Sequence, residues 1–393
     1  MLAPMQSDAP FPAVDEPITA PVLVIGAGPA GLAVAGCLAE RGVQAQMIES
    51  GDAVGASWRN HYRRLKLHTV KQHSALPLRP FPRDYPRYVT RGQMVDYLAD
   101  YARAFELRPW FGQEALAVTR HPDGWLTRCK SGRAFVSPAV VLATGANRRP
   151  QWPKFPGEQA YRGQVSHSAS YHDAQPFIGQ RVLVGGMGNT GAEIALDLAV
   201  QGAHATLSVR APLNIVRRDV LGRPTHLTAL ALSRLPTRMA DAIAVLFRDL
   251  TVGNLRAYGI ETSRLSPLRQ LREEGRTPVI DVGTLDLIRK GLIPVRPGVS
   301  AFTPEGVRFS DGRQEGFDAV ILATGYQSGV GELFPQETVP VDGKGLPDGV
   351  VGTGPLAGVY FIGYDIRQPS GLLRTIGQQA IQIAAELSAV RAS

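Results

Sequence analysis

The chain has 393 residues, 44% hydrophobic and 19% charged, which is typical of a soluble protein of two or three domains. No apolar run reaches the roughly 18 residues of a transmembrane helix. The two isolated cysteines predict neither a disulfide framework nor a metal-ligand cluster, and this cysteine usage fits a cytoplasmic location. The net charge of +8 is spread over dispersed arginines, so it favours anionic cofactors and substrates rather than nucleic acid.

We interpret residues 1–20 as a loose N-terminal tail, because they lack the cationic start and apolar core of a signal peptide. Residues 22–25 then predict a buried parallel strand, which runs into Gly26-x-Gly28-x-x-Gly31 and an alanine-rich helix to residue 41. In such a motif the glycines permit a sharp turn, close approach of a pyrophosphate, and close packing of the helix on the sheet.

A second apolar run, residues 44–48, ends at Glu49, about 20 residues after the glycines, where an acid can accept hydrogen bonds from a ribose diol. Strand, glycines, helix, strand and acid in this order predict a dinucleotide site. The alternative is a glycine turn in an ordinary α/β domain.

The next segments supply a loop, a helix and a meander. The loop at residues 51–59 carries Trp58, which either covers a cofactor or is simply a buried tryptophan. The proline-rich stretch 76–86 forbids a helix, and its aromatic residues argue against disorder. Residues 91–105 predict an amphipathic helix, residues 109–136 an antiparallel meander, and residues 140–145 a buried strand with a small-residue end.

The opening pattern then occurs again. A strand at residues 181–184 precedes Gly186-x-Gly188-x-x-Gly191, and a helix to residue 201 and a strand at 205–209 follow. This strand ends at Arg210 instead of an acid, which suits a ribose 2′-phosphate, with Arg217 and Arg218 as candidate assistants. The second site therefore predicts NADPH; a solvated strand-end charge is the alternative for Arg210.

The rest of the chain completes the repeat. Residues 227–255 look helical, and we leave open whether they form a lid, a subunit interface, a membrane contact or a packed helix. A short helix is expected at 281–291, alternating strands at 295–309, and a strand whose Ala323-Thr324-Gly325 ending repeats Ala143-Thr144-Gly145. A strand at 359–363 and a helix at 372–390, broken early at Gly377, end the chain.

These motifs resemble the class B flavoprotein monooxygenases of the flavin-containing monooxygenase superfamily. Tyr161-x-Gly163-x-x-x-His167-x-x-x-Tyr171 is similar to their linker fingerprint. Residues 65–68, 76–82, 188–189, 278–284 and 323–326, together with Trp58, resemble most closely the YUCCA-type indole-3-pyruvate monooxygenases. His68 stands where many flavin-containing monooxygenases carry an asparagine beside the flavin, and residues 368–374 depart in some positions from the plant pattern.

The resemblance implies an α/β fold with two Rossmann-like dinucleotide-binding domains of the glutathione-reductase-like three-layer β/β/α type, the NADPH domain being inserted into a split FAD domain. The expected divisions are the tail at 1–20, the first segment of the FAD-binding domain at 21–155, the NADPH-binding domain at 156–317, and the second segment of the FAD-binding domain at 318–393.

The implied cofactors are FAD and NADPH, and the implied chemistry uses a C4a-(hydro)peroxyflavin. The YUCCA-type reaction is oxidative decarboxylation of an aromatic 2-oxo acid such as indole-3-pyruvate to indole-3-acetate. Two alternatives are weighed against it: oxygenation of a heteroatom, an indole or a ketone in the Baeyer–Villiger manner, and a non-catalytic redox sensor that binds dinucleotides. We expect a small-molecule substrate and O₂ as partners, no nucleic acid and no stable membrane insertion, and we leave a homodimer open.

His68 is the candidate catalytic residue, and no metal ligand is expected. The candidate cofactor-binding residues are Gly26, Gly28, Pro29, Ala30, Gly31, Glu49, Ser50, Ser57, Trp58, Leu67, His68, Val118, Ala143, Thr144, Gly145, Gly186, Gly188, Asn189, Thr190, Gly191 and Arg210.

Overall fold

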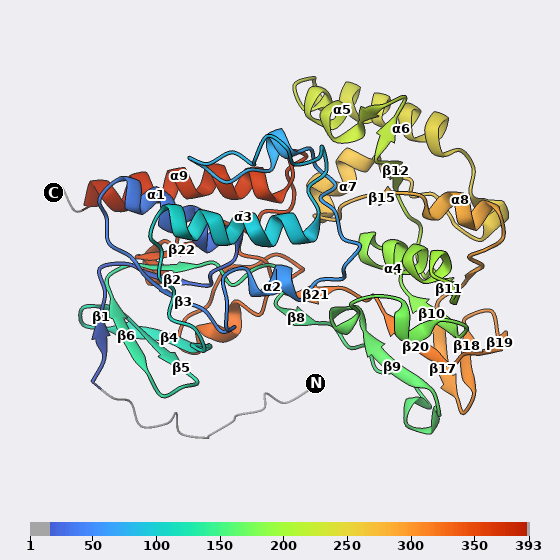
Figure 1. Ribbon diagram of the computed structural model, residues 1–393, viewed down its shortest axis with the longest axis horizontal. Helices are drawn as coiled ribbons and strands as arrows, with labels where there is room; N and C mark the ends of the chain where they lie inside the picture. The colour runs from blue at the N-terminus through green and yellow to red at the C-terminus, as the bar shows by residue number, and fades with distance from the viewer. Residues whose placement is uncertain (1–15, 391–393) are drawn as a thin grey trace.

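The computed structural model describes residues 16–390 and has two lobes (Figure 1). The first lobe is built on a parallel sheet of order β22-β7-β2-β3, whose strands are almost wholly apolar because both faces are covered. The strands are β2 (Leu23–Ile25), β3 (Gln46–Ile48), β7 (Val140–Leu142) and β22 (Val359–Phe361).

Helices cover one face of this sheet and an antiparallel sheet covers the other (Figure 1). The helices are α1 (Pro29–Glu40), α3 (Arg91–Ala104) and α9 (Leu372–Val390), which is continuous through Gly377, so the expected break there is wrong. The antiparallel strands are β4 (Ala115–His121), β5 (Gly124–Cys129) and β6 (Ala134–Ser137), which confirms the predicted meander. The first lobe therefore has the three-layer plan.

The second lobe repeats the plan with a five-stranded parallel sheet of order β16-β11-β10-β20-β9. Its strands are β9 (Gln164–His167), β10 (Arg181–Gly185), β11 (His204–Ser208), β16 (Val295–Arg296) and β20 (Ala319–Leu322). One face packs on α4 (Asn189–Val200) and α8 (Thr284–Arg289), and the other on the antiparallel strands β17 (Val299–Thr303), β18 (Gly306–Phe309) and β19 (Gln314–Gly316). The chain thus has an α/β fold with two Rossmann-like units.

Two stretches differ from the expected divisions. Strand β20 pairs with β10 and β9, so residues 319–322 belong to the second sheet, although a boundary at 317/318 would assign them to the first domain. The reason is the repeat itself, because β20 lies beside β10 as β7 lies beside β2. Near the N-terminus, Ile18–Thr19 is strand β1, paired with β6, so the loose tail is wrong for these two residues; residues 1–15 lie outside the described range.

A helical insertion follows β11. It contains paired strands β12 (Ile215–Arg217) and β15 (Val279–Asp281), a hairpin of β13 (Asp219–Val220) and β14 (Arg223–Pro224), and helices α5 (Thr225–Leu232), α6 (Thr237–Val252) and α7 (Pro267–Glu274). Asp281 therefore ends a strand, and the short helix expected from residue 281 begins only at Thr284. Helix α6 packs inward through Ala240, Ala244, Arg248 and Val252 and exposes Met239, Ile243, Leu246 and Leu250.

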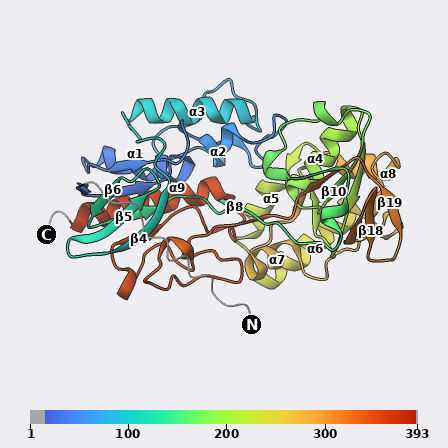
Figure 2. The ribbon, with the colours of Figure 1, turned by 90° about the horizontal axis from the view of Figure 1, so that it is seen from below.

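The chain crosses between the lobes twice, and the two crossings pair as strands β8 (Arg149–Pro150) and β21 (Tyr326–Gln327). Both views place this ribbon between the lobes (Figures 1 and 2). The proline-rich loop over residues 76–86 is ordered, because Phe81 is buried with its ring centroid 4.2 Å from that of Tyr97. None of the helices within residues 16–390 is long and apolar enough to cross a membrane.

Candidate active site

The first glycine turn lies between β2 and α1 and leaves no room for side chains at two of its three glycines. Gly26 has φ +113°, and a Cβ there would lie 2.5 Å from the carbonyl oxygen of Ala143. A Cβ at Gly31 would overlap the carbonyl oxygen of Gly26, so only glycine lets α1 begin this close to the sheet. A Cβ at Gly28, in contrast, would meet nothing within 4 Å, so this glycine faces open space.

The start of α1 offers unpaired donors to that open space. Its N-cap, Gly28, provides no side-chain hydrogen bond, and the first intrahelical donor is Leu32, whose N–H reaches the Gly28 carbonyl at 3.0 Å. Pro29 has no backbone N–H group. The N–H groups of Ala30 and Gly31 lie before the first intrahelical hydrogen bond, so they have no acceptor within the helix. This geometry fits a diphosphate, which the free N–H groups and the positive end of the helix dipole would bind.

Hydrogen bonds hold the Glu49 side chain beside this turn. Its Oε2 accepts from the Ala27 N–H at 2.7 Å, and its Oε1 accepts from the Gly51 N–H at 2.8 Å and the Ser50 hydroxyl at 3.1 Å. These bonds hold the carboxylate at the carboxyl end of β3, next to the first glycine turn. The predicted contact with a ribose diol is compatible with this position.

Two further predicted segments border the same turn. The Gly55 N–H donates to the Ala27 carbonyl at 2.9 Å, which places α2 (Ala56–Arg59) over the turn; Ser57 is exposed and Trp58 packs half-buried against the first lobe's core. Beyond β7, the Ala143 N–H donates to the Ile25 carbonyl at 2.9 Å and the Thr144 hydroxyl lies 2.8 Å from that of Tyr364. Gly145 follows with φ +86°.

The second turn repeats the first. Gly186 has φ +112° and a Cβ there would lie 2.7 Å from the Ala323 carbonyl oxygen, Gly191 has no room beside Gly186, and Gly188 faces open space. The N-cap of α4, Gly188, has φ −83° and ψ −173°, against −82° and −172° at Gly28. The two lobes therefore present matching helix starts that each have space for a diphosphate, and we name them the first cradle (residues 26–31) and the second cradle (residues 186–191).

Asn189 and Thr190, the polar side chains of the second cradle, have different surroundings. The Asn189 amide holds the start of β15: its Oδ1 accepts from the Ile280 N–H at 2.6 Å and its Nδ2 donates to the Pro278 carbonyl at 3.3 Å. The Asn189 side chain thus bonds within the protein. The amide keeps one N–H and one lone pair unused, and its contact with a nucleotide remains a prediction. Thr190 is half-buried and lies at the helix start, where the first backbone N–H groups are.

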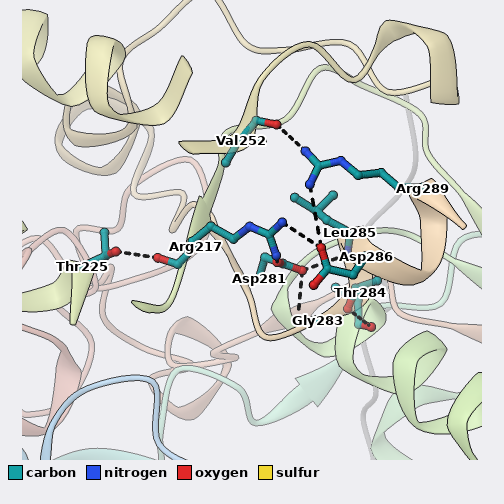
Figure 3. Close-up of polar contacts among 10 residues, drawn as sticks. Arg217, Thr225, Val252, Asp281, Gly283, Thr284, Leu285, Asp286 and Arg289 are labelled. Atoms are coloured by element: carbon teal, nitrogen blue, oxygen red, sulfur yellow. Dashed lines mark hydrogen bonds and ion pairs between the residues drawn. The ribbon is translucent and has the colours of Figure 1, made fainter. Parts of the chain in front are cut away.

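Three candidate arginines follow β11. Arg217 and Arg218 form ion pairs with aspartates, whereas Arg210 has no carboxylate partner among the described residues. Arg210 is exposed, its stem lies against Gly298, and no ion pair involves it within residues 16–390. Arg217 donates to Asp286 and to Asp281 at 2.8 Å each, and the hydrogen bond to Asp286, with the charges of both acids, raises its pKa against the opposing effect of burial (Figure 3). Arg218 pairs with Asp219 and lies over the Tyr88 ring, so neither is free to assist with a phosphate.

His68 lies at the contact between the lobes. Its Nε2 is 2.6 Å from Oε1 of Glu193, a side chain in the second turn of α4 that is only 4% exposed. The hydroxyl of buried Tyr62 also hydrogen-bonds Glu193, and burial, followed by the Glu193 charge, raises the Tyr62 pKa. A loop of the first lobe is thereby joined to the helix that forms the second cradle.

Two predicted residues are interior. Val118 is fully buried in β4 and belongs to the core between the sheets, and Leu67 is buried with its N–H bonded to the Val89 carbonyl at 2.8 Å. The side chain of Val118 therefore faces other core residues, so an adenine contact there would fall to its backbone. Both assignments remain predictions.

Sequence reasoning missed Glu193 and Tyr62. The signal for Glu193 was present, because it is an acid among the alanines and aliphatic residues of a helix expected to lie on a sheet. Its partner could not be identified from the sequence, because His68 lies 125 residues away along the chain.

The matched family model is described as flavin-binding monooxygenase-like and covers residues 19–336. The chain belongs to this family. It is accordingly an oxidoreductase, a flavin-binding monooxygenase. The match covers both cradles.

Curated relatives agree with the family, and a solved structure shares the fold. The rice (Oryza sativa subsp. japonica) indole-3-pyruvate monooxygenase YUCCA1 is 38% identical over 93% of this chain and 90% of its own. The Arabidopsis thaliana indole-3-pyruvate monooxygenase YUCCA6 is 37% identical over 90% and 87%. A flavin-containing monooxygenase from Stenotrophomonas maltophilia shares the fold, with a TM-score of 0.71 at 23% identity over 95% of this chain and 99% of that one.

Alanine substitutions at the open glycines test the two cradles. Gly28→Ala adds a methyl group that clashes with no protein atom but occupies the space at the start of α1, so we expect normal folding and an FAD Kd raised at least about tenfold, roughly 1.4 kcal/mol. The measurement is fluorescence titration of the apoprotein with FAD, alongside thermal unfolding.

Gly188→Ala should weaken NADP⁺ binding by a similar factor and leave FAD binding unchanged. Gly92→Ala in α3, where a Cβ also meets nothing within 4 Å, is the matched control and should change neither. Native FAD affinity in Gly28→Ala would contradict the assignment of the first cradle.

A double-mutant cycle tests the contact between the lobes. His68→Ala leaves the buried Glu193 without this partner, and Glu193→Ala leaves the part-buried His68 without it, so we expect a coupling free energy of about 1–3 kcal/mol in denaturant unfolding. The control cycle uses the exposed pair Arg269–Glu273 on α7, where we expect no more than about 0.5 kcal/mol. Equal couplings in both cycles would show that the buried pair does not join the lobes.

Proposed function

We propose that this flavin monooxygenase catalyses the oxidative decarboxylation of an aromatic 2-oxo acid such as indole-3-pyruvate, giving the acid with one carbon fewer. The observation that carries the proposal is the 38% identity, over 93% of the chain, to an enzyme named for indole-3-pyruvate. The balanced reaction consumes the 2-oxo acid, O₂, NADPH and a proton, and releases the shortened acid, CO₂, water and NADP⁺.

When bound, NADPH would supply the hydride, and FAD would accept it and pass the electrons to O₂ so that one oxygen atom reaches the keto carbon. The chain's own task is to hold the two nucleotides and keep them dry. The first cradle with Glu49 would hold FAD, whereas the second cradle with Arg210 would hold NADPH. The different strand-end residues, an acid after β3 and an arginine after β11, support this allocation.

The lobe contact supports a role for His68 close to the reacting groups. Its ring is fixed from one side by Glu193, and Glu193 in turn is fixed by Tyr62. His68 therefore keeps a defined orientation beside the helix that carries the second cradle, as a residue that holds or moves a proton requires. A cytoplasmic location belongs to the same proposal.

Product analysis tests the reaction. We expect purified enzyme with NADPH and indole-3-pyruvate to release one CO₂ per NADPH, and ¹⁸O₂ to place one labelled atom in the acid product. The enzyme could instead release no CO₂ from any 2-oxo acid and form a sulfoxide, N-oxide or lactone from a matched sulfide, amine or ketone. This result would replace the proposed reaction with one of the other oxygenation reactions. A flavin that NADPH fails to bleach under anaerobic conditions would favour a non-catalytic sensor.

Arg210→Ala tests the phosphate contact. Loss of a bidentate charge-assisted pair costs about 1.5–3 kcal/mol, so the KM for NADPH should rise roughly 10- to 100-fold and the KM for NADH should barely change. Arg238→Ala, an exposed arginine on α6, is the control and should affect neither. Equal increases for the two nucleotides would remove the 2′-phosphate contact from Arg210.

A further inference from the structure

Three basic side chains meet where α9 begins. Arg374 in the first turn of α9 donates from Nη1 to Nδ1 of His73, at the end of the short 3₁₀ turn Lys71–His73. The His73 ring contacts the ring of His226, the second residue of α5, edge-on at 5.7 Å between centroids. The three residues come from three separate segments, two in the first lobe and one in the helical insertion.

No ion pair joins this cluster to an acid within residues 16–390. No ion pair to Arg374 occurs in the described portion of the chain, and the first turn of α9 contains no acid. Burial, followed by the Arg374 charge, lowers the pKa of His73. Burial also lowers the pKa of His226; the hydrogen bond to the Ser370 carbonyl opposes this effect, and His73 and Arg374 lower the pKa further. Arg374 therefore carries its positive charge beside two imidazole rings whose neutral forms are favoured.

One polar atom in the cluster has no partner. His226 Nε2 bonds the Ser370 carbonyl at 3.1 Å, and its Nδ1 is buried without a hydrogen bond. An isolated buried nitrogen of this kind costs free energy unless a ligand satisfies it. An anion beside it would favour the protonated ring, whose Nδ1–H would then donate to that anion.

The cluster lies next to the predicted catalytic residue. Gly371, the residue before α9, has φ +86° and a Cβ there would lie 2.7 Å from Cγ2 of Thr69, the residue after His68. Figure 1 shows this end of α9 turned toward the second lobe, away from the C-terminus. None of the three residues of the cluster belongs to either cradle.

We propose that Arg374, with His226 and His73 beside it, binds the carboxylate of the 2-oxo acid substrate. The inference rests on the proposed function, because it assigns the substrate's acidic group to this place. The planar fork of Arg374 matches a carboxylate in bidentate fashion, and the first N–H groups of α9, which lack intrahelical acceptors, add positive potential at the same end. The subsite would select 2-oxo acids over neutral ketones.

Arg374→Gln tests the subsite by comparing a charged substrate with a neutral ligand. We expect the KM for indole-3-pyruvate to rise about 10- to 100-fold, and the Kd for indole-3-acetamide, followed by flavin absorbance, to change less than about threefold. Arg374→Lys retains the charge but loses the fork, so it should restore some of the difference. Arg103→Gln, an exposed arginine at the end of α3, is the matched control and should change neither value.

Binding of indole-3-acetate, followed by the perturbation of flavin absorbance, separates this inference from the proposed function. A wild-type enzyme that releases no CO₂ from any 2-oxo acid would defeat the proposed function alone, and a Kd raised about tenfold or more in Arg374→Gln would still support the anion subsite. Unchanged KM and Kd values in Arg374→Gln would overturn the subsite. His226→Asn, which leaves Arg374 in place, is the second variant, and it too should raise the Kd if the subsite is correct.

Discussion

The structure depends on a steric constraint: a helix must begin almost in contact with the strand before it. At Gly31 and Gly191 any Cβ would overlap the carbonyl oxygen of the glycine five residues earlier, so glycine alone permits this approach. The constraint fixes where each helix starts, and hence where its free N–H groups point. The glycines between them, Gly28 and Gly188, then leave space in front of those groups. The matching geometry of the two cradles follows from this one arrangement.

The sequence was sufficient for features whose causes are local. Glycine spacing predicted both turns, alternation predicted the β4–β5–β6 meander, and the repeated Ala-Thr-Gly ending predicted that β7 and β20 have equivalent places. The domain boundary at 317/318 was drawn before β20, although the repeat implied that β20 pairs with β10. The two-residue strand β1 was missed because so short a segment has no periodicity to detect, and only its pairing with β6 orders it.

Features that depend on distant partners could not be predicted. Arg217 was a candidate for a phosphate, but Asp281 and Asp286, 64 and 69 residues away, neutralise it in the fold. Glu193 was not assigned a role because its partner His68 belongs to the other lobe. Arg374, His73 and His226 are likewise separated by up to 301 residues. A basic residue can be judged available for a ligand only after folding has shown which acids it meets.

Helix α4 takes part both in the second cradle and in the contact with His68. Its first residue follows Gly188, and Glu193, little more than one turn later, holds His68 at 2.6 Å. Because an α-helix rises about 1.5 Å per residue, a shift by one residue would carry Glu193 beyond hydrogen-bonding reach of that ring. In the proposed allocation, redesign toward another nicotinamide nucleotide would therefore be confined to Arg210, after the end of β11. An insertion or deletion between Gly188 and Glu193 would therefore separate the start of α4 from the contact that joins this helix to His68.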